Sequence, residues 1–166
     1  MKRVTYAAIA ERDFRNAYLM LRESELNDAA RYVSQSVEKN LKHIINEHAD
    51  NDYYPLSTHN LPVIARRVEE LLGTKYSRED HAWFRSLKSW YYDTNYPGDN
   101  YVELVQEELD ELFAWFPLFT EKVKAQIRAQ TGFEGDDKDP EVDSVAESEI
   151  SPLLRLSLFD PSDDNE

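Results

Sequence analysis

The sequence predicts an all-α protein, and three observations support this. The 166 residues include only four glycines. Between the glycines, apolar residues recur at steps of three and four, which is the period of an amphipathic helix. Capping residues, prolines and glycines stand at the ends of these periodic segments. We therefore expect an up-and-down bundle of four to five helices, followed by an acidic C-terminal tail.

The first three expected helices follow one another with short links. The first runs from about residue 5 to 23 and the second from about residue 27 to 48. Asn27 can cap the start of the second helix with its side-chain oxygen. After a polar link, Thr58 can cap a third helix, which Gly73 ends.

Two capping-box sequences precede the last two expected helices. Ser77 is followed three residues later by Asp80, before a fourth helix that is rich in aromatic residues. Asn100 with Glu103 repeats this spacing before a fifth helix. Pro117 should kink or restart the fifth helix, which continues to about residue 130.

Negative charge is concentrated at the C-terminal end. The net charge is -14, and residues 134–166 hold 12 acidic against two basic residues. Residues 1–133 therefore keep 21 acids and 17 bases, which is close to neutral. We expect a helical bundle over residues 1–131 and a largely flexible acidic tail over 132–166. A short apolar segment of the tail, residues 150–159, could dock on the bundle or on a partner.

Composition excludes several classes of protein. Without cysteine there are no disulfides and no thiolate metal sites, so a cytoplasmic location is the default. No apolar run is long enough for a membrane span. No glycine-rich phosphate loop and no paired histidine ligands occur, and we expect neither a metal nor a cofactor. The overall acidity argues against sequence-specific binding of duplex DNA.

The most organised polar set lies on the second expected helix. Gln35, Glu38, Lys39 and Lys42 recur at helical steps, and Glu38 is spaced to form an ion pair with Lys42. Two interpretations remain open on this pattern. The set is either an ordinary solvated helix face or part of a binding site.

Four segments of the chain together indicate a family. They are Glu11-Arg12-Asp13-Phe14-Arg15-Asn16-Ala17, Gln35-Ser36-Val37-Glu38-Lys39-Asn40-Leu41-Lys42, Thr58-His59-Asn60-Leu61 and Tyr91-Tyr92-Asp93-Thr94-Asn95-Tyr96-Pro97-Gly98. In order and spacing they resemble the HEPN family, the higher eukaryote and prokaryote nucleotide-binding domains. The resemblance covers about residues 5–128.

The resemblance implies a helical bundle, usually a homodimer, that takes part in nucleotide or RNA transactions beside a small nucleotidyltransferase partner. Many HEPN proteins are toxin ribonucleases that need an Arg followed, four to six residues later, by His. None of the four histidines here has an arginine at that distance. Asn95 also stands where the family has an Arg before Tyr-Pro. We therefore expect no catalytic residues.

The candidate nucleotide-binding residues are Gln35, Glu38, Lys39, Lys42, His59, Tyr92 and Tyr96. Lys39 and Lys42 would face phosphate groups, and the tyrosines would stack on a base. For His59 two interpretations stand beside each other. It either bonds a neighbouring helix as a structural residue, or it joins a shallow polar site with the two lysines.

Three functions are compatible with these residues. The first is a non-catalytic HEPN-like domain that binds nucleotide or RNA as a dimeric binding or partner subunit, for example in a toxin-antitoxin system. The second is an interaction or scaffold module that uses its acidic and apolar tail. The third is an RNA-cleaving toxin with a non-standard site.

Overall fold

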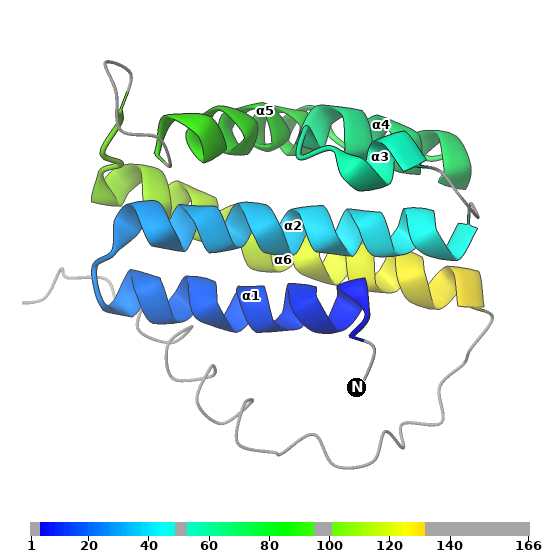
Figure 1. Ribbon diagram of the computed structural model, residues 1–166, viewed down its shortest axis with the longest axis horizontal. Coiled ribbons are helices and arrows are strands. Elements are labelled where there is room, and N and C mark those ends of the chain that lie inside the picture. Colours follow the sequence, from blue (N-terminus) through cyan, green and yellow to red (C-terminus); the bar gives the residue numbers. More distant parts are fainter. Residues whose placement is uncertain (1–3, 49–52, 95–100, 132–166) are drawn as a thin grey trace, which may run out of the picture. The chain divides into compact units, whose positions relative to one another are not determined.

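The computed structural model describes residues 4–48, 53–94 and 101–131. They lie within one compact unit, Met1–Gly132. The described residues form six helices: α1 (Tyr6–Arg22), α2 (Leu26–His48), α3 (Tyr53–Ser57), α4 (Leu61–Leu72), α5 (Arg78–Asp93) and α6 (Gln106–Thr131) (Figure 1). No strand occurs in these ranges, so the expected all-α class is confirmed. The predicted tail, residues 132–166 with its segment 150–159, lies outside the described residues.

Helix α2 is the central element of the bundle. It packs against each of the other five helices, and Figure 1 shows it between α1 and the group of α3, α4 and α5. Small residues allow α1 and α2 to approach closely, since Ala10, Ala17, Ala29 and Ala30 are all buried. The buried Ser36 hydroxyl donates a hydrogen bond to the Ala10 carbonyl at 2.9 Å. This contact fixes α1 against the middle of α2.

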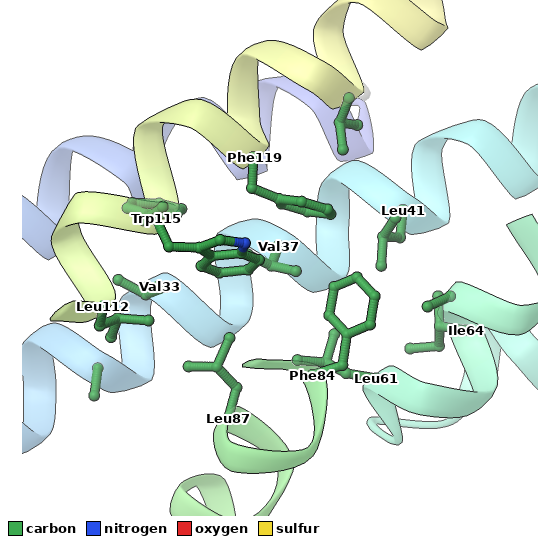
Figure 2. Close-up of a cluster of buried hydrophobic side chains, with 14 of the residues drawn as sticks. Val33, Val37, Leu41, Leu61, Ile64, Phe84, Leu87, Leu112, Trp115 and Phe119 are labelled. Carbon is green, nitrogen blue, oxygen red and sulfur yellow. The ribbon is translucent and has the colours of Figure 1, made fainter. Parts of the chain in front are cut away.

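Apolar side chains from four helices form the core in Figure 2. They are Val33, Val37 and Leu41 of α2, Leu61 and Ile64 of α4, Phe84 and Leu87 of α5, and Leu112, Trp115 and Phe119 of α6. Trp115 stacks on Phe119 with ring centroids 4.7 Å apart. The Trp115 Nε1 atom donates to Asp80 Oδ1 at 3.0 Å, so the buried indole has a polar partner. On α5, Phe84 is buried in this core, and Trp83 and Trp90 pack against it.

The capping box predicted at the start of α5 is confirmed. The Ser77 hydroxyl accepts a hydrogen bond from the Asp80 amide, and the Asp80 carboxylate accepts one from the Ser77 amide. The cap predicted for the third expected helix is wrong. Asn60 is the N-cap of α4, and the Thr58 hydroxyl instead accepts a hydrogen bond from the Asn60 amide at 3.1 Å.

Asn27 has a different role from the predicted helix cap. Its Oδ1 atom accepts from the Leu104 amide at 2.9 Å, and its Nδ2 atom donates to the Val102 carbonyl at 3.0 Å. These bonds hold the segment that precedes α6 against the start of α2. The sequence pattern could not show this, because the partners lie more than 70 residues away.

The start of α6 also differs from the prediction. The helix begins at Gln106, and the Glu108 carboxylate accepts a hydrogen bond from the Val105 amide at 3.0 Å. The predicted cap, Asn100, lies outside the described residues. Past this start, α6 continues through Pro117 as one helix, so the predicted restart does not occur. The Thr120 hydroxyl donates to the Phe116 carbonyl in the same stretch.

One short helix is not evident from the sequence pattern. Helix α3 is a single turn within the link that was expected to be only polar, and Pro55 is buried there. A five-residue helix is too short for periodicity to reveal it. None of the six helices has both the length and the hydropathy needed to cross a bilayer.

Candidate functional site

A buried carboxylate lies at the centre of the predicted site. Glu38, in the middle of α2, is 2% exposed. Its Oε1 atom accepts hydrogen bonds from the Lys42 ammonium at 2.7 Å and from the Lys39 ammonium at 3.0 Å. Its Oε2 atom lies 3.0 Å from Nδ1 of His59. The interpretation of this set as an ordinary solvated helix face is therefore wrong for Glu38.

The surroundings of Glu38 keep it ionised. Burial alone would raise the pKa of this carboxyl group. The hydrogen bond from Lys42, the charges of Lys39 and Lys42, and the hydrogen bond with His59 outweigh burial and lower the pKa below its ordinary value. Glu38 is therefore negatively charged at neutral pH, in contact with both lysines and the imidazole.

The two lysines differ in what they can reach. Lys42 is 3% exposed and its ammonium group bonds Glu38, so it neutralises the buried carboxylate and does not face the solvent. The side chain of Lys39 is 22% exposed. Of the two predicted phosphate contacts, only Lys39 can extend toward a ligand without breaking up the core.

His59 connects the buried Glu38 carboxylate with the protein surface. It precedes α4, and its side chain is 49% exposed. Because Nδ1 faces Glu38, the Nε2 atom on the other side of the ring points away from that carboxylate. The imidazole stacks on Tyr91 of α5, with ring centroids 5.5 Å apart and planes 19° apart. Both interpretations of His59 are thus compatible with its position, since it bonds a neighbouring helix and also borders Lys39.

None of the other predicted residues bonds the Glu38 carboxylate in the described ranges. Tyr92 is exposed and meets Tyr91 edge to face, with centroids 5.4 Å apart. Gln35 is half-buried one turn before Glu38, and its amide forms no hydrogen bond with another described residue. Tyr96 lies outside the described residues.

Two residues of the site were missing from the predicted set. Tyr91, the direct neighbour of the predicted Tyr92, makes the stack with His59. Asp13 of α1 is 4% exposed and close enough to Lys39 and Glu38 for their charges to act on it. Burial raises the pKa of Asp13, while Arg12 and Lys39 oppose that rise. The sequence feature that could have revealed it is its helical spacing, because Asp13 lies three residues after Ala10 and four before Ala17 on the buried face of α1.

A second histidine and carboxylate pair has a structural role and provides a contrast. The Oε1 atom of Glu69 on α4 accepts a hydrogen bond from the Tyr76 amide at 2.8 Å. The same atom lies 3.0 Å from Nε2 of His81. These contacts fix the link between α4 and α5. The Glu69 carboxylate thus accepts a hydrogen bond from a backbone amide, whereas Glu38 bonds only side chains in the described contacts.

The site can bind through charge and stacking. Across the described ranges, no three His, Asp or Glu side chains are grouped as metal ligands would be. The side chains of Lys39 and His59 are partly exposed, Tyr91 is half-buried against His59, and Tyr92 is exposed. An ammonium beside stacked rings suits a ligand that combines a phosphate with an aromatic base.

Comparison with known proteins agrees with the fold and the motifs. The profile of the HEPN domain family matches residues 5–125, which include α1 to α5 and most of α6. No curated protein and no solved structure gives a significant match. Because the profile covers well over half of the 166 residues, the chain belongs to the HEPN domain family.

Proposed function

We propose that the protein binds a nucleotide or RNA, without cleaving it, at the surface formed by Lys39, His59 and Tyr91. HEPN domains are nucleotide- or RNA-associated helical domains, and this chain is one of them. The observation that carries the proposal is the contact between His59 and Glu38, since it holds a half-exposed imidazole in place beside an ammonium group.

The chemistry of the surface fits such a ligand in two ways. The Lys39 ammonium attracts phosphate, and its contact with Glu38 limits the positions that the side chain samples. The rings of Tyr91 and Tyr92 present aromatic faces and edges to a base. Stacking on such rings contributes about 1–3 kcal/mol per base. A weak, sequence-tolerant site is therefore expected.

Binding without cleavage is favoured by the residues that are missing. No arginine precedes any histidine at the spacing of the family's ribonuclease motif, and Asn95 replaces the arginine before Tyr-Pro. An asparagine side chain cannot provide the charged, bidentate donor that a guanidinium offers to phosphate. In this proposal the protein acts in the cytoplasm as a homodimeric subunit of a nucleotidyltransferase system.

Isothermal titration calorimetry with ATP, GTP and a short single-stranded RNA tests the proposal. The wild type should bind at least one of these ligands, and Lys39→Ala should weaken binding about tenfold. Lys124→Ala serves as a matched control, because Lys124 lies on α6 and pairs with Glu11 of α1. No heat with any ligand, in the wild type as in Lys39→Ala, would end the proposal.

A second function is favoured by one specific observation. A carboxylate bonded to Nδ1 of a histidine whose side chain is half-exposed is the arrangement that orients a general base. The Glu38 and His59 pair could therefore assist RNA cleavage at a non-standard site. Incubation of tRNA with the wild type and with His59→Ala discriminates between binding and cleavage. If the wild type cleaves tRNA and His59→Ala does not, the function of the site is catalysis and the proposal of binding without cleavage is wrong.

A further inference from the structure

A second polar site lies beside the first. A groove of about 360 Å³ is lined mainly by residues of α4 and its N-cap, with one residue each from α3 and α5. Its polar lining consists of Asn60, Arg66, Arg67, Glu70 and Lys88, and Pro55 and Val63 contribute apolar surface. A volume of this size falls within the range of small-molecule sites.

The charges of the groove favour an anion. Three basic side chains face a single carboxylate, Glu70, which already accepts a hydrogen bond from Arg67 at 3.1 Å. Neither Arg66 nor Lys88 forms an ion pair within the ranges that the structure describes. Two positive charges are thus left without a counter-charge, in a chain whose overall charge is -14.

Asn60 adds an unused acceptor to the same groove. Its Oδ1 atom is buried and has no hydrogen-bond partner in the described structure. The usual partners of an N-cap side chain are not available, because Pro62 has no amide hydrogen and the Val63 amide bonds the Asn60 backbone carbonyl. A buried acceptor without a partner is unfavourable, so a rotation of the Asn60 side chain that brings Oδ1 to a ligand donor in the groove would gain affinity.

The groove and the site at His59 are neighbours. Asn60 follows His59 directly in the chain. Lys88 and Tyr91 lie three residues apart on α5, so they belong to the same face of that helix. A ligand whose base meets His59 and Tyr91 would therefore direct its phosphate groups toward Lys88 and Arg66.

We infer that this groove binds the phosphate groups of the nucleotide or RNA that the proposed function places at His59, and the inference rests on that function. Arg66 would bond phosphate oxygens through its planar guanidinium group, and Lys88 would add a point charge. Asn60 would accept a hydrogen bond from a ribose hydroxyl or a base amino group. The phosphates belong either to a free nucleoside triphosphate or to a single-stranded RNA.

Three probes separate these possibilities: inorganic tripolyphosphate, ATP and a ten-nucleotide single-stranded RNA, each titrated into the full chain. Arg66→Ala combined with Lys88→Ala should weaken all three at least tenfold. Arg15→Ala, on the exposed face of α1, removes the same kind of charge elsewhere and should change affinity less than twofold. His59→Ala should weaken ATP and RNA but leave tripolyphosphate binding intact.

A further variant separates loss of binding from loss of folding. Asn60→Asp places a carboxylate in the groove while it keeps an acceptor at the N-cap of α4, where negative charge is favourable. Circular dichroism should show that the variant keeps its helical fold, and it should bind all three probes at least tenfold more weakly. Normal binding by a folded Asn60→Asp protein would overturn the inference.

The outcomes distinguish the inference from the function on which it rests. If ATP or RNA responds to His59→Ala but not to the Arg66 and Lys88 double variant, the groove is excluded and the proposed function stands. If only tripolyphosphate binds, and the double variant abolishes it, the groove stands and nucleotide binding falls. A salt slope that becomes shallower by about 0.7 per removed cation identifies RNA as the source of the phosphates.

Discussion

The Nδ1 atom of His59 lies 3.0 Å from the Oε2 atom of Glu38, and this contact joins the segment that precedes the N-cap of α4 to the middle of α2. It connects a carboxylate that is nearly inaccessible with an imidazole that is half-exposed. The buried side of the contact stabilises the bundle, and the exposed side orients a ring toward the solvent. Both consequences can be tested separately.

The first prediction concerns the buried ion pair. Glu38→Gln should lower the free energy of unfolding by about 3–5 kcal/mol, because it leaves the buried Lys42 ammonium without a counter-charge. Lys42→Met should be milder, since Glu38 keeps Lys39 and His59 as partners. Urea denaturation of both variants measures the difference. Equal losses, or a larger loss in Lys42→Met, would contradict the assigned arrangement.

The second prediction concerns acid. The folded-state pKa values of Glu38, Glu69 and Asp80 lie below the ordinary 4.5 and 3.8, although burial opposes this in each case, because lysine or histidine contacts and hydrogen bonds outweigh it. Their contribution to stability is complete above the ordinary values. It is lost as the pH falls through the lowered ones, since the unfolded chain binds protons first.

Melting temperature should therefore fall between about pH 5 and pH 3. Glu38→Gln should flatten that slope, while Glu103→Gln, at an exposed position, should leave it unchanged. Asp13 acts in the opposite direction, because burial raises its pKa. A wild-type slope that is unaffected by Glu38→Gln would show that this carboxyl group is not stabilised as described.

The third prediction concerns a buried hydroxyl group. The Tyr18 oxygen has no hydrogen-bond partner among the described residues, and burial raises the pKa of Tyr18 to about 12. Tyr18→Phe should keep or raise stability, by up to about 1 kcal/mol. Tyr76→Phe should lose about 1 kcal/mol instead, because the Tyr76 hydroxyl donates to Gln126 at 3.0 Å. Thermal unfolding of the two variants compares them directly.

Tyr18→Phe also has a consequence at alkaline pH. A folded-state pKa above the ordinary value of 10 means that stability is lost as the pH rises from 10 toward 12. The variant should lose less stability over that range than the wild type. Identical alkaline profiles would show that the hydroxyl group is not buried in the folded protein.

The fourth prediction concerns the segment before α6. Asn27→Ala removes the hydrogen bonds to Leu104 and Val102 and should lower stability by about 1–2 kcal/mol. Amide hydrogen exchange at Leu104 should accelerate more than exchange in the α4 core. Asn27→Asp keeps an acceptor for the Leu104 amide, so it should protect that amide better than Asn27→Ala does.

The all-α class and the capping box of α5 could be predicted because each depends on residues that are close in sequence. Helical periodicity and the Ser77 to Asp80 spacing are local patterns. Asn27 was misassigned because its partners come from a distant segment. Thr58 was misassigned because the competing cap, Asn60, lies only two residues away.

The candidate site was predictable in part. Helical spacing brought Glu38 and Lys42 together, and the family motif added His59. Spacing could not show that Lys42 is buried, since a charged residue at that step usually faces solvent. Tyr91 was passed over in favour of Tyr92 because a shift of one residue turns a side chain about 100° around a helix, and only packing decides between them.

Side-chain NMR of the four histidines during titration with ATP or single-stranded RNA tests the binding site most directly. The imidazole signals of His59 should move saturably. Those of His43 and His48 near the end of α2, and of His81 beside Glu69, should stay in place. If saturating ligand leaves His59 unmoved, or moves His81 alone, the site described around Glu38 does not bind nucleotide or RNA.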